Sequence, residues 1–285
     1  MNNYKPYKEN KTLIESIKKD FNNFLKKIYW YPSTKIQYFK RTYFQKIRDE
    51  SNLISILTIS KNRSERLSRV LEKIKINTFN KKKIEVLIFI DHDENQKNEY
   101  EVLVNLYKKD ININLYTDNI KNNTEKHNYL AKISKGDLIF LVTDDMYLEK
   151  NWDTSINKEA NKFKKNESFC IWPKEIGLKY PYLHCNAPII SRKWFVSCGY
   201  YLHYNLFHYY ADNWICDLCR SSGKFLITKN YIWKHEHPDT IPELIDNTYL
   251  NIKKRSKDSK EHEIYKNLQK TKKITVKKIL EKVIY

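Results

Sequence analysis

Glycine is scarce in this sequence, with only four residues, at positions 136, 177, 199 and 223 of 285. The phosphate-binding loops of Rossmann-type dinucleotide-binding proteins and of P-loop proteins need several glycines close together. The wide spacing of the four glycines excludes both kinds of loop. If the protein binds a nucleotide, it must use another architecture.

Long apolar runs are also missing. No stretch of 18 apolar residues occurs, so we expect no membrane-spanning segment. The first ten residues, MNNYKPYKEN, are polar and lack the apolar centre of a secretory signal. We therefore expect a cytoplasmic protein, whose contact with a membrane would be peripheral.

The cysteines show no metal or disulfide pattern. Five are present, an odd number, and the single CxxC is CDLC at 216–219. This motif lies in a stretch with helical periodicity, which would turn both thiols inward. We expect reduced and mostly buried thiols, as is usual in the cytosol.

Positive charge is abundant and unevenly distributed. The chain carries 53 Lys and Arg against 34 Asp and Glu, a formal net charge of +19. Residues 1–50 hold 12 basic and 5 acidic side chains, and residues 240–285 hold 12 and 6. Basic segments of this kind bind anionic surfaces, either membrane lipid or nucleic acid. They are also typical of lysine-rich helices whose charge only keeps them soluble. We expect basic helical extensions at 1–50 and 240–285 around a central domain at 51–239.

The central region alternates between strand and helix patterns. Apolar, β-branched runs predict strands at 53–60, 84–91, 113–117 and 137–143. Helical periodicity predicts helices at 64–76, 98–109 and 124–134, the last closed by Gly136. Alternation with continuously apolar strands is typical of a parallel α/β sheet flanked by helices.

Polar side chains follow the predicted strands, where ligands bind in such sheets. Thr58, Ser60 and Asn62 end the first strand, Asp91 ends the second, and Asp144 and Asp145 end the fourth. Two adjacent carboxylates with no arginine beside them in the sequence suit a hard divalent cation that also takes diphosphate oxygens. The alternative is a turn in which one of the two caps local backbone N–H groups.

Several segments in this order resemble the family 2-like glycosyltransferases of the GT-A fold. They include ISILTISKNRSERLSRVLEKI, HNYLAKISKGDLIFLVTDDM, SRKWFVSCGYY and KHEHP. The resemblance runs from about Leu53 to Pro238 and implies a Rossmann-like, mostly parallel sheet. It also implies a nucleoside-diphosphate sugar as donor, with a UDP-sugar favoured, and Mn²⁺ or Mg²⁺ as cofactor. The usual Asp-x-Asp motif of the family is reduced here to adjacent Asp residues, because Val142 occupies its first position.

The resemblance implies roles for individual residues. Asp91 would accept a hydrogen bond from the pyrimidine, Asp144 would bind the ribose, and Asp145 would ligate the metal. Thr58 and Ser60 would line the base and ribose pocket, and Asn128 would lie near the phosphates. The nucleotide-binding residues are then Thr58, Ser60, Asn62, Asp91, Asn128 and Asp144.

The second half of the domain would supply the acceptor side. Asp212, at the start of a predicted helix at 211–223, matches the catalytic base of inverting members of the family. Its alternative role is only to cap that helix. His235 would approach the metal and His237 the acceptor, although paired histidines on a surface are common. Trp214, a neighbour of Asp212, would stack on an acceptor sugar.

The predicted function is metal-dependent, inverting transfer of a sugar to a glycan, lipid-linked or protein acceptor. One alternative is a sugar nucleotidyltransferase, although SKNRSERL lacks the glycines usual in the first loop of those enzymes. Another is a non-enzymatic protein that binds nucleic acid or a membrane surface. Carboxylates at the sheet edge would repel phosphate in the absence of a metal, which disfavours nucleic acid. The basic ends would serve membrane association or a homo-oligomer.

Overall fold

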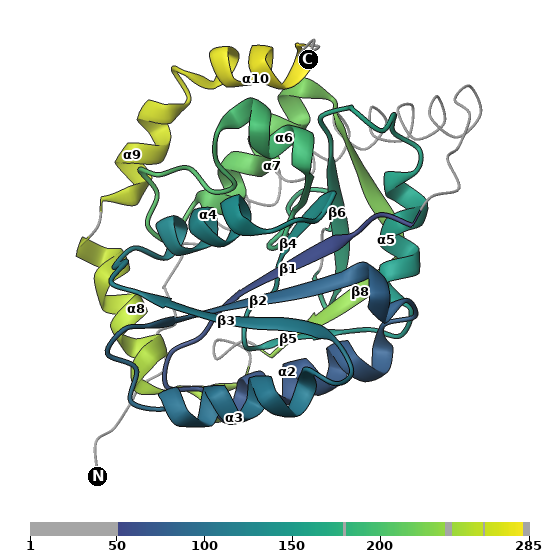
Figure 1. Ribbon diagram of the computed structural model, residues 1–285. Coiled ribbons are helices and arrows are strands. Elements are labelled where there is room, and N and C mark those ends of the chain that lie inside the picture. Colours follow the sequence, from purple (N-terminus) through teal and green to yellow (C-terminus); the bar gives the residue numbers. More distant parts are fainter. Residues whose placement is uncertain (1–50, 179–180, 237–240, 259, 282–285) are drawn as a thin grey trace.

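The centre of the molecule is one mixed sheet of eight strands, seen in Figure 1. The computed structural model describes residues 51–178, 181–236, 241–258 and 260–281. The strand order is β3-β2-β1-β4-β7-β6-β8-β5. The predicted N-terminal extension, residues 1–50, lies outside the described residues.

Half of the sheet is the parallel α/β unit expected from the sequence. Its strands are β1 (Ile54–Ile59), β2 (Ile84–Asp91), β3 (Asn112–Asp118) and β4 (Leu138–Leu141). They are joined through α2 (Ser64–Asn77), the short 3₁₀ turn η1 (Lys81–Lys83), α3 (Lys97–Tyr107) and α4 (Asn123–Ile133). The first seven residues of β2 are buried, and all of them except Glu85 are apolar.

The other half of the sheet mixes both strand directions. Its strands are β5 (Met146–Leu148), β6 (Cys170–Ile176), β7 (Ile189–Ser191) and β8 (Phe225–His235). β7 runs antiparallel to both β4 and β6, and β5 runs antiparallel to β8. The β6–β8 register shifts between Trp172 and Lys174, where Pro173 has no N–H to donate to a neighbouring strand. Four of the seven strand pairings are parallel, so the sheet is mostly parallel, as predicted.

Helices cover both faces of the sheet. α2 and α3 lie on one face, and α4, α6 (Arg192–Cys198) and α7 (Ala211–Ser222) lie on the other (Figure 1). α5 (Trp152–Ala160) packs against β8 and β6. All five cysteines are free and buried, which confirms the expectation that the thiols of the CDLC motif face inward.

Gly136 does not end a helix, contrary to the expectation from its position. α4 ends at Ile133, and Ser134 is its C-cap. A Cβ atom at residue 136 would lie 2.2 Å from Ser55 Oγ and 2.6 Å from the Ser55 backbone nitrogen. The glycine is therefore required for the close approach of the chain entering β4 to β1.

The C-terminal extension is helical, as expected, and it packs on the sheet domain. After the short turn η2 (Pro242–Leu244) come α8 (Asn247–Asp258), α9 (Glu261–Leu268) and α10 (Lys272–Leu280). Leu268 and Ile279 are buried in the core on the α7 side of the sheet. Asp217 of α7 accepts hydrogen bonds from Tyr265 and, at 2.9 Å, from Gln269. This extension therefore shares the core of the domain.

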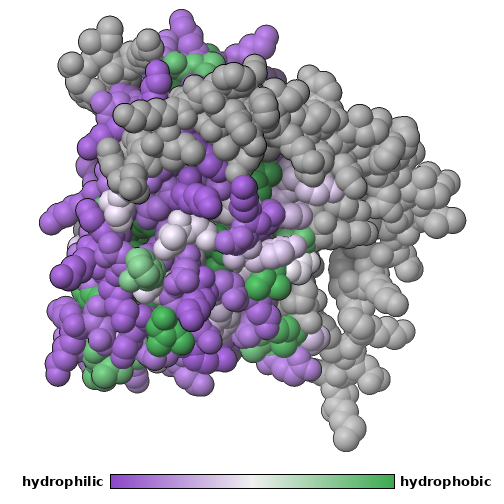
Figure 2. Space-filling view, turned by 90° about the vertical axis from the view of Figure 1, so that its right-hand side faces the viewer, coloured by the Kyte–Doolittle hydropathy of each residue, from purple (hydrophilic) through white to green (hydrophobic). Residues whose placement is uncertain are grey.

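The described surface in Figure 2 is mostly hydrophilic, with apolar residues in small separate spots. Within the described ranges, no helix is both long enough and apolar enough to cross a membrane.

Candidate active site

The carboxyl edge of the parallel strands brings together three of the predicted residues. β1 lies between β2 and β4, so Ser60, Asp91 and Asp144 follow neighbouring strands. Ser60 Oγ donates to Asp144 Oδ2 at 2.8 Å and also lies 2.8 Å from the hydroxyl of Tyr100. The sheet topology, rather than local sequence, creates this cluster.

Asp144 is buried, and an arginine that is distant in the sequence lies beside it. Arg63, from the loop after β1, donates to Asp144 Oδ1 at 3.1 Å. Its guanidinium also makes two 2.7 Å bonds to Asp246, just before α8. Burial raises the pKa of Asp144 to about 6, even though Arg63 favours the ionised form. The carboxylate pair therefore does have an arginine partner, contrary to the sequence-based assumption.

Asp145 faces a histidine from the far side of the sheet. β5 and β8 pair Met146 with His235, which brings the His235 ring to the residue before Met146. His235 Nε2 lies 3.3 Å from Asp145 Oδ1, and its Nδ1 lies 3.7 Å from Glu175 Oε1. Burial favours neutral imidazole, but the two carboxylates outweigh it and raise the pKa of His235 to about 9. Burial likewise opposes ionisation of Asp145, but the hydrogen bond from His235 lowers the pKa of that carboxyl.

These two side chains fit a divalent ion, but they do not enclose one. Within the described residues, no group of three or more His, Cys, Asp or Glu side chains could hold a metal. Asp145 Oδ1 and His235 Nε2 are 3.3 Å apart, similar to the roughly 3 Å between adjacent ligands of an octahedral ion with bonds of about 2.1 Å. A metal could replace the proton shared by the pair. The remaining ligands would have to come from water and substrate.

Asp91 is paired with two lysines rather than standing free. Lys61 Nζ lies 2.6 Å from Asp91 Oδ2, and Lys126 of α4 donates to Oδ1. Burial opposes ionisation, but both lysines stabilise the carboxylate, and together they lower the pKa of Asp91. A pyrimidine N–H that donates to Asp91, as predicted, would either share the carboxylate oxygens with the two lysines or displace one of them.

The remaining nucleotide-site candidates are used in local structure. Thr58 is buried, and its hydroxyl donates to the Val142 carbonyl at 2.8 Å, linking β1 to β4. Asn62 has a φ of 53°, and its backbone N–H donates to Glu94 at 3.1 Å. Asn62 therefore shapes the loop through its backbone.

Asn128 ties α4 to the loop that precedes α7. Its amide donates to the Leu202 carbonyl at 2.7 Å and accepts from the N–H groups of Tyr201 and Leu202 at 2.8 and 3.0 Å. Both polar atoms of the side chain are thus occupied by that loop.

Asp212 lies in the first turn of α7, and a histidine contacts it. The N-cap residue of α7 is Tyr210, not Asp212. Asp212 Oδ1 nevertheless accepts a hydrogen bond from the N–H of Asn213 at 2.8 Å, so its side chain does satisfy an N–H group of the first turn. His184 Nε2 lies 2.8 Å from Asp212 Oδ2, and each side chain is about 30% exposed. Burial lowers the pKa of His184, but Asp212 and Cys216 together outweigh this effect and raise the pKa to about 11. The two side chains form an ion pair that solvent can reach.

Trp214 corrects another expectation. Its side chain has no exposed surface, and its indole N–H donates to the Tyr200 hydroxyl at 3.0 Å. A ring enclosed in the core cannot stack on an acceptor sugar in this structure. His237 lies outside the described residues.

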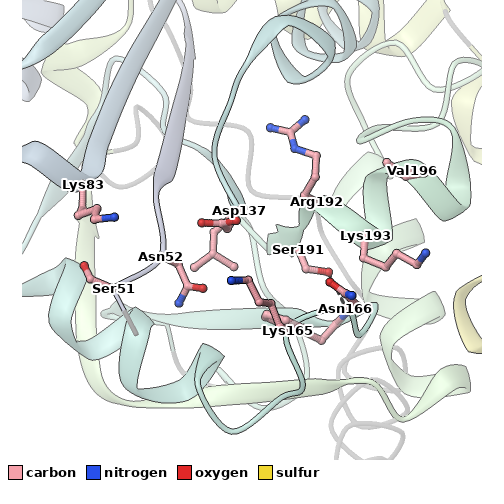
Figure 3. A pocket seen from close by; sticks show the side chains of 12 residues that line it. Ser51, Asn52, Lys83, Asp137, Lys165, Asn166, Ser191, Arg192, Lys193 and Val196 are labelled. Carbon is pink, nitrogen blue, oxygen red and sulfur yellow. Dashed lines mark hydrogen bonds between the residues drawn. The ribbon is translucent and has the colours of Figure 1, made fainter. Parts of the chain in front are cut away.

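A cavity of about 610 Å³ lies away from these residues, at the amino ends of the strands. In Figure 3, Asp137 lies between Lys83 on one side and Lys193 on the other. None of the predicted site residues lines this cavity, so it is separate from the candidate active site.

Three contacts in the site were not visible in the sequence. Arg63, Glu175 and His184 reach Asp144, His235 and Asp212 across long separations in the chain. An arginine or histidine near a carboxylate in space leaves no fixed spacing in the sequence, so only the fold reveals such pairs.

Comparison with known structures supports the fold. The chain is similar to S. aureus TarS residues 1–349, with a TM-score of 0.50 and 14% identity over 66% of this chain and 62% of that one. It is similar to the mannosyltransferase PcManGT from Pyrobaculum calidifontis, solved with GDP-Man and Mn²⁺ (TM-score 0.51, 9% identity, 70% of this chain and 63% of that one). It is also similar to GalNAc-T7 with UDP, GalNAc and Mn²⁺ (TM-score 0.53, 12% identity, 65% and 43%).

The chain therefore has the predicted GT-A fold. The matched region spans less than two thirds of the length of each of these three proteins. Comparison of the sequence with protein-family models and with curated proteins gives no match.

Proposed function

We propose that the protein is a metal-dependent glycosyltransferase that uses a nucleoside-diphosphate sugar, with a UDP-sugar favoured. The observation that carries this proposal is the juxtaposition of Asp145 and His235 at the carboxyl edge of the sheet, beside buried Asp144. The fold supports it, since similar structures contain nucleotides or nucleotide sugars with Mn²⁺.

The donor side of the site would combine the metal pair with the polar ends of the strands. Asp145 and His235 would hold Mn²⁺ or Mg²⁺, which when bound would neutralise charge on the leaving diphosphate. Asp144 would accept a hydrogen bond from the ribose. The nucleotide would also contact the loop that carries Thr58, Ser60 and Asn62, and Asp91 at the end of β2. Asn128 would act on this side only through the loop it holds.

The acceptor side would depend on Asp212. Its carboxylate would take the proton from an acceptor hydroxyl as that oxygen attacks the anomeric carbon. His184, 2.8 Å away, would hold the carboxylate in place. A single displacement on the face opposite the leaving group would invert the configuration of the sugar.

The proposal extends to the setting of the reaction. The acceptor would be a glycan, a lipid-linked acceptor or a protein, met in the cytoplasm. Lys273, Lys277 and Lys278 are exposed on α10 and would favour peripheral contact with an anionic membrane or with a second copy of the chain.

Replacement of Asp212 tests this assignment. Asp212→Asn keeps the shape of the side chain but removes its basicity, so sugar transfer should fall by about 10²–10⁴-fold. Affinity for UDP and Mn²⁺ should stay close to wild type. Asp110→Asn, which alters a surface carboxylate paired with Lys75, is the matched control and should keep full activity. Transfer by folded Asp212→Asn at the wild-type rate would overturn the role of Asp212 as base.

A further inference from the structure

The loop between α6 and α7 is unusually aromatic. Residues 200–210, here named the aromatic loop, read YYLHYNLFHYY, so more than half of them are Tyr or Phe. The loop runs from the end of α6 past α9 to the start of α7 (Figure 1). It leads directly into the helix that carries Asp212.

Both ends of the aromatic loop have a fixed backbone. At the start, the Asn128 side chain makes three hydrogen bonds to Tyr201 and Leu202. Near the end, the Glu261 carboxylate accepts the consecutive N–H groups of residues 207, 208 and 209. Glu261 is only 3% exposed, so these charge-assisted bonds are shielded from water. The loop is held by α4 on one side and α9 on the other.

The side chains of this fixed loop range from buried through half-buried to exposed. Tyr201 and Leu206 are buried and anchor the loop to the core. Tyr204 and Phe207 are each 48% exposed, and Asn205 between them is exposed as well. Large rings held on a rigid backbone lose little conformational entropy when they bind a ligand, which favours affinity.

The chemistry of these exposed groups suits a sugar ring. A pyranose has an apolar face of C–H groups and a polar rim of hydroxyls. Tyr204 and Phe207 offer exposed ring surface to the former, and the Asn205 amide offers hydrogen bonds to the latter. The Tyr204 hydroxyl donates to the Gly199 carbonyl at 3.2 Å, so toward a sugar it can act as an acceptor. An extended protein interface would be expected to bury a larger and more continuous apolar area.

The position of the aromatic loop links it to the reaction. Tyr210 is the N-cap of α7, and Asp212 follows two residues later, so the exposed rings and the carboxylate belong to one continuous segment. We infer that the aromatic loop binds a sugar ring of a glycan acceptor, with Tyr204 and Phe207 as stacking residues. This inference rests on the proposed function and replaces Trp214 as the acceptor contact.

The test measures glycan binding in the absence of donor. The full chain is titrated with gluco-, galacto-, manno- and N-acetylhexosamine-type tetrasaccharides. Wild type should bind at least one of them, and Tyr204→Ala and Phe207→Ala should each weaken that binding about three- to tenfold. Tyr204→Phe should retain most of the affinity because the ring remains. Phe79→Ala, which removes a 76% exposed ring next to the C-terminal end of α2, is the matched control and should bind as wild type does.

Affinity for UDP with Mn²⁺, measured on each variant, shows that the fold and the donor site are intact. If this affinity is present but the Tyr204→Ala/Phe207→Ala double variant binds glycan as tightly as wild type, the loop assignment is wrong. Failure of wild type to bind any of the tetrasaccharides also overturns it. The assignment would also be wrong if wild type dimerised in sedimentation experiments and the double variant did not. The loop would then be an interface between two copies of the protein. Failure of wild type to bind UDP with Mn²⁺ would instead contradict the proposed function.

Discussion

Asp144 and Asp145 are neighbours in the chain, but their carboxylates face different partners. Asp144 points to Ser60 and Arg63 on the β1 side, and Asp145 points to His235 on the β8 side. The divergence follows from their place between β4 and β5, which pair with different strands. Each of the two adjacent carboxylates thereby has its own positive partner, which offsets part of their mutual repulsion.

A residue-scale prediction concerns His127 on α4. This side chain is 6% exposed, and its Nδ1–H donates to the Asn123 carbonyl at 2.8 Å. Burial lowers the pKa of His127 to about 4, below its ordinary value of 6.5. The unfolded chain therefore binds a proton more readily between pH 6.5 and 4. The neutral ring makes its full contribution to the free energy of unfolding above pH 6.5. As the pH falls to 4, protonation of the unfolded chain lowers the free energy of unfolding by about 3 kcal/mol.

Urea unfolding at several pH values measures this effect. Wild type should lose stability between pH 6.5 and 4 more steeply than His127→Asn, which keeps a donor for Asn123 but cannot take up a proton. Acid titration of the carboxylates is common to both proteins and cancels in the comparison. Parallel curves for the two proteins would show that His127 does not control this range.

At the scale of elements, the parallel half of the sheet was predictable and the mixed half was not. β2 matches its predicted range, and the helix predicted at 64–76 is α2 with one more residue. Each of these elements is long, and its apolar pattern reflects which of its own residues are buried. The pattern can therefore be recognised from the segment alone. β5 and β7 have only three residues each and exist because of pairing with strands distant in the chain. The same limit applies to the site, where the strand ends were predictable but Arg63 and His184 were not.

α10 gives a prediction for the C-terminal elements. Ile279 is 2% exposed and packs in the core with α7, whereas the adjacent Leu280 is 49% exposed. Ile279→Ala should lower the free energy of unfolding by about 2–4 kcal/mol through lost burial and a residual cavity. Leu280→Ala, a similar truncation on the outer side, should change it by less than about 0.5 kcal/mol.

Urea denaturation of both variants decides whether α10 is part of the cooperative domain. If Ile279→Ala and Leu280→Ala had equally small effects, α10 would be only loosely associated with the sheet.

At the scale of the whole molecule, the C-terminal helices connect the two sides of the candidate site. Asp246, at the start of α8, holds Arg63 beside Asp144. Glu261 of α9 holds the aromatic loop that leads to Asp212. The region after residue 240 thus contributes to the proposed donor side and to the proposed acceptor side, although the sequence there shows only charged helices. This arrangement gives the basic extension a structural role in addition to any contact with an anionic surface.

The central claim is that Asp145 and His235 form a metal-dependent nucleotide site, and calorimetric titration with UDP and GDP tests it most directly. We expect wild type to bind at least one nucleotide in the presence of Mn²⁺ and to lose that binding when a chelator is added. Asp145→Asn should lose the metal-dependent part of the affinity, while Asp110→Asn should bind as wild type does. Equal affinity with Mn²⁺ and with chelator, or no binding of either nucleotide, would contradict the account.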